Sequence, residues 1–305
     1  MNYLAIDLGG TKIKYALMNE DADILEKGKD DTPPGTTATI DDLLEVLDTI
    51  ISKYRADIEG IALSLPGILD SDTGQSITSG ALHYLSGSNL SKILQEKYDL
   101  LVTVENDGKS AALAELWKGS LKGIKNGAVV LLGTGVGGGI IIDGKLYKGN
   151  NFAAGELSFM IFNPTTTQLW AETGGTPYLL KLVSEKTNIS THELDGYKIF
   201  EMAHANNKEV LAALNEYTYG IACQLYSLQA VLDLDIFAIG GGISRQSLLL
   251  EYLQKNIDKI EEEHPLKGIM PYIPVPRITN CHYFNDSNLI GALYHHLQVA
   301  KLKNY

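Results

Sequence analysis

The chain has 305 residues, of which 45% are hydrophobic and 20% are charged. This composition is ordinary for a globular protein, and the length is sufficient for two modest domains. A formal net charge of −12 argues against a nucleic-acid-binding surface, although a local cationic pocket for ATP remains compatible with it.

The N-terminus and the cysteines indicate a cytoplasmic protein. No basic stretch followed by a long apolar run opens the chain, and no apolar run approaches membrane-spanning length. Cys223 and Cys281 lie outside any zinc-type spacing, which argues against structural zinc and a disulfide framework. A reducing compartment without membrane association fits these features best.

The first 89 residues predict a sheet with one crossover helix. An apolar strand at 3–6 leads into a turn at 9–11, and apolar residues then alternate from 13 to 17. A helix that begins at Asp41 or Asp42 and a strand at 61–65 imply parallel pairing with a right-handed crossover. The segment from Asp70 to Asn89 is rich in Ser, Gly and Thr, and we expect a long surface loop that binds something.

A polar cluster follows the next predicted strand, at 101–104. Asn106 and Asp107 end this strand and precede an alanine-rich helix. Ligands gather at the carboxyl ends of strands in open parallel sheets, which favours a functional site here. The alternative is that one of the two residues only caps the helix.

The stretch at 128–155 predicts a strand, a glycine turn, a second strand and an Asp-Gly hairpin. We interpret residues 133–139, with five glycines and Thr134, as a turn whose bare backbone N–H groups can approach a phosphate. A merely flexible loop is the alternative. The same pattern of strand, glycine turn and strand occurs at the N-terminus, with Gly9, Gly10 and Thr11 in the turn.

The C-terminal half predicts mostly helices around one further strand. Residues 191–230 are expected to be helical, and the strand at 236–239 runs into the triple glycine at 240–242 before another helix. The last helix is expected at 288–301. Glu156 and Glu172 are the two carboxylates that could accept hydrogen bonds from a polyol, although solvated surface glutamates are the default.

Two common phosphate motifs do not fit. No glycine turn matches G-x-x-x-x-G-K-[ST], which excludes a P-loop. Residues 133–138 fit G-x-G-x-x-G formally, but they open a strand rather than a helix, which argues against a dinucleotide fold. The repeated hairpin instead predicts two similar α/β domains that hold one nucleotide in the cleft between them.

The motifs together resemble the ROK family of repressors, open reading frames and sugar kinases, over essentially the whole chain. The resemblance is carried by DLGGTK at 7–12, END at 105–107, LGTGVGGG at 132–139, AGE at 154–156 and IGGGI at 239–243. It implies a two-domain α/β fold of the actin-like, ribonuclease-H-like ATPases. We expect an N-terminal domain at 1–118 plus 288–305 and a C-terminal domain at 119–287.

The resemblance also implies roles for individual residues. Asp107 would be the general base for phosphoryl transfer from ATP to a sugar hydroxyl, and Asp7 would lie near the accompanying Mg²⁺. The nucleotide would be contacted by Gly9, Gly10, Thr11, Lys12, Gly133, Thr134, Gly135, Gly240, Gly241 and Gly242. The sugar would be contacted by Gly80, Asn89, Asn106, Asp107, Glu156 and Glu172.

The sequence departs from the family at a histidine and a cysteine-rich zinc loop. Phe159 stands at the histidine position, and the loop at 162–168 has no cysteine, so no zinc site is expected. The aromatic ring could stack on a sugar, but we expect it to fill the volume of the imidazole. The passage at 171–176 resembles that of zinc-less members related to β-glucoside kinases, which places Glu172 in the sugar pocket.

Three functions from different classes follow. An ATP-dependent sugar kinase is favoured, acting on glucose, a β-glucoside or N-acetylmannosamine, with a homodimer suggested by the resemblance. A DNA-binding regulator is disfavoured because the first strand begins at Tyr3 and the chain is acidic. A silent sugar-binding protein is disfavoured because Asp107 and both glycine hairpins are present.

Overall fold

The computed structural model describes residues 1–163, 165–265, 267 and 273–302, and Pro164 of the cysteine-free loop lies outside them. The chain forms two compact units. Unit 1 comprises Met1–Lys122, Leu146–Gly155 and Asn285–Tyr305, and unit 2 comprises Gly123–Lys145 and Glu156–Phe284. Each unit is built on its own five-stranded sheet.

The sheet of unit 1 has the order β3-β2-β1-β4-β7. Its strands are β1 (Asn2–Leu8), β2 (Lys12–Asn19), β3 (Ile24–Asp31), β4 (Gly60–Leu65) and β7 (Leu101–Asn106). The first three strands form an antiparallel meander, and β4 and β7 then add in parallel to β1. The strands β4 and β7 are buried along their whole length, as parallel strands covered on both faces should be.

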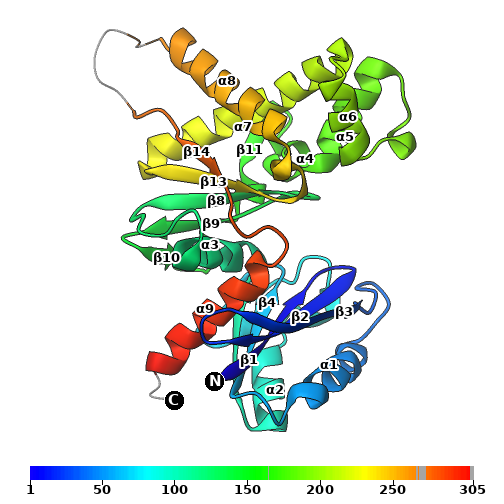
Figure 1. Ribbon diagram of the computed structural model, residues 1–305, viewed down its shortest axis with the longest axis vertical. Coiled ribbons are helices and arrows are strands. Elements are labelled where there is room, and N and C mark those ends of the chain that lie inside the picture. Colours follow the sequence, from blue (N-terminus) through cyan, green and yellow to red (C-terminus); the bar gives the residue numbers. More distant parts are fainter. Residues whose placement is uncertain (164, 266, 268–272, 303–305) are drawn as a thin grey trace. The chain divides into compact units, whose positions relative to one another are not determined.

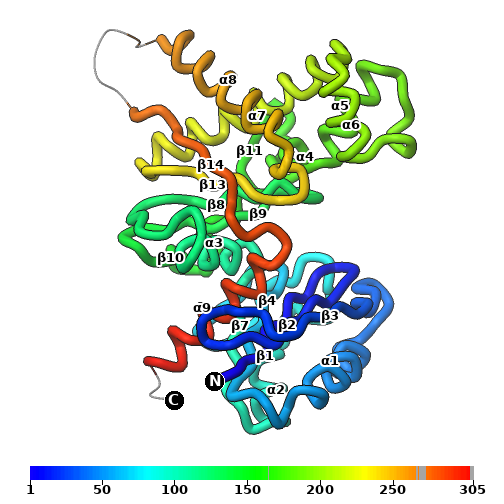
Figure 2. Tube along the Cα trace, viewed as in Figure 1, coloured from blue at the N-terminus to red at the C-terminus, as the bar shows by residue number. Residues whose placement is uncertain are grey.

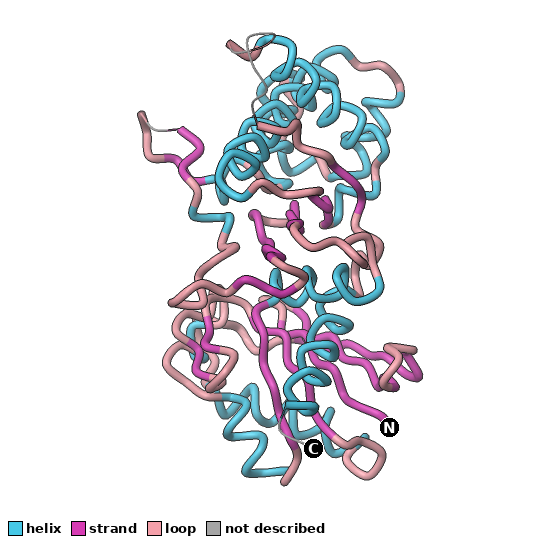
Figure 3. The backbone as a smooth tube through the Cα atoms, turned by 90° about the vertical axis from the view of Figure 1, so that its left-hand side faces the viewer, coloured by secondary structure: helices cyan, strands magenta, loops and turns pink. Residues whose placement is uncertain are grey.

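Helices cover both faces of this sheet (Figures 1 and 3). They are α1 (Ile40–Tyr54), α2 (Leu90–Tyr98), α3 (Asp107–Lys118) and α9 (Ser287–Leu302). The apolar sides of α1 and α2 share a core with Leu4, Ile6 and Leu8 of β1. The residues of β1 that alternate with these three face α9, where the centroid of the Tyr3 ring lies 5.3 Å from that of His296. Figure 2 shows this last helix beside the N-terminal strands.

The sheet of unit 2 repeats this topology in the order β10-β9-β8-β13-β14. Its strands are β8 (Gly127–Leu132), β9 (Val136–Ile142), β10 (Lys145–Tyr147), β13 (Ile236–Gly240) and β14 (Ile278–Asn280). Again an antiparallel hairpin, β8-β9, is followed by two strands that add in parallel. Asp143 and Gly144 join β9 to β10 with φ angles of 51° and 71°, the left-handed values that a tight hairpin turn requires.

Helices of unit 2 bury their apolar sides on β8 and β13. They are α5 (Thr176–Thr187), α6 (Gly196–His204), α7 (Lys208–Leu232) and α8 (Ser247–Glu263), with the short α4 (Trp170–Thr173). The remaining elements of the two units are short: β5 (Leu69–Asp70), β6 (Gln75–Ser76), η1 (His83–Leu85), η2 (Leu157–Phe159), β11 (Ile161–Asn163), β12 (Gln168–Leu169), η3 (Thr191–Glu193) and η4 (Gly242–Arg245).

Two predictions from the sequence are wrong in part. The expected surface loop at 70–89 contains the hairpin β5-β6 and the turn η1, and Leu82 and Leu85 are fully buried within it. The expected helical stretch at 191–230 is interrupted after His204, where Asn206 is left-handed with φ 59° and Asn207 caps α7. Buried leucines fold the first segment, and a cap residue interrupts the helices of the second. Neither feature produces a periodic pattern in the sequence.

Candidate functional site

The polar cluster at the end of β7 is organised by the start of α3. Asn106 caps this helix, because its Oδ1 accepts the Lys109 backbone N–H at 3.0 Å. Its Nδ2 donates to the Gly67 carbonyl at 2.9 Å and to Asp107 Oδ1 at 3.0 Å, and the same Oδ1 accepts the Gly108 N–H at 2.7 Å. The capping role therefore belongs to Asn106, while the half-buried Asp107 carboxylate is oriented by two donors at the first position of α3.

The turn between β1 and β2 lies in the same unit. The N–H of Gly9 donates to the Lys12 carbonyl at 3.0 Å, and Thr32 Oγ1 donates to the Gly9 carbonyl at 2.8 Å. Thr11 and Lys12 are exposed, and Lys12 Nζ lies 2.5 Å from Asp31 Oδ1. The turn is thus fixed by its own backbone while its polar side chains face outward.

A third group of contacts places Gly80 and Gly10 near the end of β7. A Cβ atom on Gly80 would lie 3.4 Å from Pro66 Cβ, and one on Gly10 would lie 3.3 Å from Ala81 Cβ. Since Asn106 bonds to the next residue, Gly67, unit 1 brings Gly10, Gly80, Asn106 and Asp107 together around one turn.

Asn89 is held in a different set of contacts. Its Oδ1 accepts the Lys92 N–H and the Ser91 hydroxyl, both at 2.9 Å, and its Nδ2 donates to the Thr73 carbonyl at 2.8 Å. These bonds cap α2 and tie it to the β5-β6 turn. They account for an asparagine at this position without a ligand.

Asp7 is buried on β1, 4% exposed. Its Oδ1 accepts the Ser64 hydroxyl at 2.8 Å and the Asn288 amide at 3.0 Å. Its Oδ2 lies 3.7 Å from Lys14 Nζ, which is beyond hydrogen-bonding distance. One carboxylate oxygen is therefore fixed by neutral donors, and the other faces a cation.

In unit 2, the turn between β8 and β9 is narrow. The N–H of Gly133 donates to the Gly135 carbonyl at 3.0 Å, and the Gly133 carbonyl accepts the Thr176 N–H at 2.7 Å. Thr134 is exposed at the tip, and a Cβ atom on Gly175 would lie only 2.6 Å from the Thr134 carbonyl. Close backbone packing against the start of α5 thus fixes this turn.

The predicted turn at 133–139 is too long. Residues 137–139 belong to β9 and pair with β8. A Cβ atom on Gly138 would lie 2.5 Å from the Val129 carbonyl and 2.6 Å from Leu157 Cδ1, so glycine is needed there for packing.

The triple glycine begins at the last residue of β13 and runs into η4, close to where the sequence pattern indicates. Gly241 has φ 97°, and a Cβ atom on it would lie 2.2 Å from the Leu132 carbonyl. A Cβ atom on Gly240 would lie 2.9 Å from Cys281 Sγ, whereas one on Gly242 would meet nothing within 4 Å. Only the last glycine therefore leaves open space beside the backbone.

Glu156 and Phe159 are joined by the turn η2. The Phe159 N–H donates to the Glu156 carbonyl at 3.1 Å, and the intervening Leu157 is buried. This bond brings the backbones of Glu156 and Phe159 together across the turn. Phe159 is 63% exposed, so its ring is not packed into the core, and the expectation that it fills the volume of the imidazole stays a prediction.

Glu172 lies on α4, which packs against η2. Its Oε1 accepts the Leu169 N–H at 3.2 Å, and the Trp170 N–H donates to the Met160 carbonyl at 2.7 Å. Unit 2 therefore places Glu156, Phe159 and Glu172 on two neighbouring elements.

Sequence reasoning missed three polar residues of unit 1 and named a fourth, Glu105, without giving it a role. Ser64 and Asn288 hold Asp7, and Glu105 and Lys148 form an ion pair beside Asn106. A charged residue directly after the apolar run at 101–104 was a usable signal for Glu105. Asn288 reaches its partner across 281 positions, which no local pattern indicates.

The described part of the chain contains no helix long and apolar enough to cross a membrane. Within the same residues, no three His, Cys, Asp or Glu side chains gather as a metal-binding group.

Comparison with known proteins defines the class. A model of the ROK family matches residues 3–298, and the chain belongs to this family. Among its relatives are a β-glucoside kinase of Listeria monocytogenes, 29% identical over 98% of each chain, and an N-acetyl-D-glucosamine kinase of Aliivibrio fischeri, 28% identical over 96% of this chain and 98% of the relative.

The solved structures agree on the fold. A ROK family protein from Streptococcus pneumoniae in complex with sucrose superposes with a TM-score of 0.87, at 32% identity over 99% of this chain and all of the other. The fold is accordingly that of the actin-like, ribonuclease-H-like ATPases.

Proposed function

We propose that this protein is an ATP-dependent sugar kinase in which Asp107 is the general base. The observation that carries the proposal is the division of roles at the start of α3. Asn106 supplies the helix cap, so the Asp107 carboxylate, oriented by the Gly108 N–H and the Asn106 amide, is not needed for capping. Relatives named as kinases over almost the whole chain length support the same reaction.

The mechanism requires mainly positioning and charge stabilisation. As the sugar hydroxyl oxygen attacks the γ-phosphorus of ATP, the bond from that phosphorus to the β,γ-bridging oxygen breaks to release ADP, and Asp107 accepts the hydroxyl proton. We assign the phosphate contacts to Gly9, Gly10, Thr11 and Lys12 in unit 1 and to Gly133, Thr134 and Gly135 in unit 2. The equivalent places of the two turns in two sheets of the same topology support this assignment.

We assign the adenosine to the turn at 240–242. Gly242 supports this role, because its missing side chain leaves open space at the end of β13. Gly240 and Gly241 hold the turn against Leu131 and Leu132.

Asp7 is the residue that would hold Mg²⁺. Ser64 and Asn288 donate to Oδ1 and not to Oδ2, and Lys14 Nζ lies 3.7 Å from Oδ2. The Oδ2 atom could therefore contact a hard cation that is bound mostly through water and phosphate oxygens. When bound, the ion neutralises charge on the phosphates. The lack of a three-residue metal cluster among the described residues is compatible with this kind of site.

The acceptor is proposed to be a β-glucoside, with glucose or an N-acetylated hexosamine as the alternative. Asn106, Glu156 and Glu172 would accept hydroxyl hydrogen bonds, and Gly80, which lies near Asn106 in unit 1, would also contact the sugar. The exposed Phe159 ring lies three residues beyond Glu156, across η2, and is assigned to stacking on the second ring of a glycoside. A free hexose has no such ring to contact.

A coupled assay of ATP consumption tests both parts of the proposal. Glucose, cellobiose, aryl β-glucosides, N-acetylglucosamine and N-acetylmannosamine would be compared with a no-sugar control. Phe159→Ala should raise the KM for cellobiose about tenfold and leave the KM for glucose within about twofold, as the loss of one stacking contact would. Equal changes in the KM for cellobiose and the KM for glucose would remove Phe159 from the acceptor site. If none of the sugars in the panel increased ATP consumption above the no-sugar control, the proposed kinase activity would be contradicted.

We further propose a cytoplasmic homodimer. Cys223 and Cys281 are not joined in a disulfide, which is compatible with a reducing compartment. Sedimentation at micromolar concentration tests the dimer, and a single species at the monomer mass would contradict it.

A further inference from the structure

Glu105 is a buried carboxylate directly beside the proposed base. It lies near the end of β7 and is 1% exposed. Its Oε1 accepts the backbone N–H of Asn106 at 2.9 Å. A charged carboxylate removed from water in this way requires a compensating cation. The residue that supplies the cation therefore helps to position the end of β7.

Lys148 supplies this positive charge. Its Nζ lies 3.3 Å from Glu105 Oε2, 2.5 Å from Ser71 Oγ and 3.5 Å from Asp72 Oδ1. The lysine belongs to Leu146–Gly155, which clusters with unit 1, and its side chain is 22% exposed. The ammonium therefore joins the turn between β5 and β6 to the end of β7.

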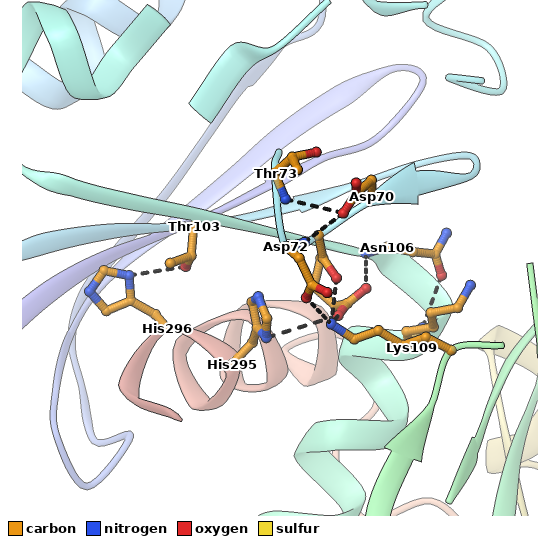
Figure 4. Close-up of polar contacts among 11 residues, drawn as sticks. Asp70, Asp72, Thr73, Thr103, Asn106, Lys109, His295 and His296 are labelled. Atoms are coloured by element: carbon orange, nitrogen blue, oxygen red, sulfur yellow. Dashed lines mark hydrogen bonds and ion pairs between the residues drawn. The ribbon is translucent and has the colours of Figure 1, made fainter. Parts of the chain in front are cut away.

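His295 on α9 also faces this carboxylate, with Nδ1 3.9 Å from Glu105 Oε2 (Figure 4). Burial lowers the pKa of His295, against the opposing effect of Glu105. The imidazole is accordingly neutral near pH 7, and Asp72, whose Oδ1 lies 3.5 Å from Lys148 Nζ, supplies no positive charge. Lys148 is left as the cation in this group of described residues.

We propose that Lys148 is a positioning residue for phosphoryl transfer: through Glu105 it fixes the backbone of Asn106, and through the Asn106 amide the carboxylate of Asp107. Each link is short. The distances are 3.3 Å from Lys148 to Glu105, 2.9 Å from Glu105 to the Asn106 N–H, and 3.0 Å from Asn106 Nδ2 to Asp107 Oδ1. The assignment rests on the proposed function, because it takes Asp107 as the base.

The arrangement favours positioning over stability. A buried ion pair is weak evidence for stabilisation, since apolar replacements of both partners are often neutral. The orientation of this carboxylate is restricted, however, because Oε1 accepts a hydrogen bond and Oε2 faces an ammonium at 3.3 Å. A reacting group misplaced by about 1 Å can lose on the order of 10² in rate. The lysine is therefore expected to affect turnover more than folding once both charges are removed together.

Four variants test the proposal. Lys148→Met removes the charge and keeps the length, Lys148→Arg keeps the charge, and the double variant Glu105→Gln/Lys148→Met removes both charges so that no buried carboxylate lacks a cation. Lys186→Met is the matched control, because this lysine pairs with Glu216 at 2.8 Å and neither residue is assigned to the reaction. For each, kcat, the KM for ATP and the melting temperature are measured with the best sugar of the panel.

Lys148→Met should lower kcat about 10- to 100-fold with the KM for ATP within about twofold, and Lys148→Arg should recover most of the activity. The double variant should regain the melting temperature but not kcat, and the control should keep wild-type kcat. Wild-type kcat in folded Lys148→Met or in the double variant would overturn the proposal. So would a loss of kcat that only follows a loss of stability. A wild-type enzyme that phosphorylates no sugar would instead overturn the proposed function, and the assignment of Lys148 with it.

Discussion

Replacing the carboxylate of Asp107 by an amide separates catalysis from folding. In Asp107→Asn the side-chain oxygen can still accept the Gly108 N–H and the Asn106 amide, bonds of 2.7 and 3.0 Å in the wild type. What is lost is a negative charge in the first turn of α3, worth about 0.3–1 kcal/mol through the helix dipole. The free energy of unfolding should therefore fall by about 1 kcal/mol at most.

The effect on turnover should be much larger. Loss of a general base lowers rates by about 10²- to 10⁴-fold, which corresponds to about 2.7–5.5 kcal/mol in the activation free energy. Because the amide cannot take the hydroxyl proton, kcat should fall by this factor while the KM for ATP stays nearly constant. Steady-state kinetics and urea unfolding of the same preparation measure the two quantities.

A control and a contrast complete this experiment. Asp41→Asn removes the equivalent first-turn charge from α1 and should cost the same fraction of a kcal/mol with no change in kcat. Asn106→Ala, by comparison, removes the helix cap and the bond to Gly67, so it would lower stability and activity together. Turnover of Asp107→Asn within threefold of the wild type would refute the assignment of the base.

Two further predictions concern the packing of each unit. Gly241→Ala should destabilise unit 2 by about 2–3 kcal/mol, because φ at this position is 97° and the new Cβ would lie 2.2 Å from the Leu132 carbonyl. Gly242→Ala should leave the melting temperature within about 2 °C of the wild type. Equal shifts of the melting temperature in the two variants would contradict the packing argument. Burial lowers the pKa of His296 to about 4, below the value of 6.5 for an exposed imidazole. As the pH falls below 6.5, the imidazole binds a proton in the unfolded chain but not in the folded chain. The free energy of unfolding should therefore fall by about 2 kcal/mol by pH 5. Urea unfolding at pH 7.5 and 5 should show a smaller loss for His296→Gln, and identical losses would contradict the assigned cause.

The duplicated architecture could be predicted because its signals are local. An apolar run followed by glycine specifies a strand and a turn wherever it occurs, and the two copies become sheets of the same order, β3-β2-β1-β4-β7 and β10-β9-β8-β13-β14. The hairpin β5-β6 and the break before α7 could not be predicted. They depend on the burial of Leu82 and Leu85 and on the cap at Asn207, which only the folded chain defines.

The candidate site was predictable to the same extent. Asn106 and Asp107 follow one another after a strand, so a short pattern indicates them. Lys148 and Asn288 act at distances in sequence that no pattern covers, since one pairs with Glu105 and the other with Asp7 on the first strand. Residues that hold a site are in general harder to predict than residues that form it, because their partners are set by the tertiary fold.

The glycines show why residue type alone does not define a binding site. At Gly138 and Gly241 a Cβ atom would collide with the Val129 and Leu132 carbonyls, at 2.5 and 2.2 Å, so packing within unit 2 demands glycine there. At Gly133 and Gly242 a Cβ would meet nothing within 4 Å, so no such demand exists. Packing therefore does not explain the glycines at these two positions, and the proposed function assigns a nucleotide to the space beside them. Alanine at either position should consequently raise the KM for ATP while leaving the fold intact, the opposite of its effect at Gly241.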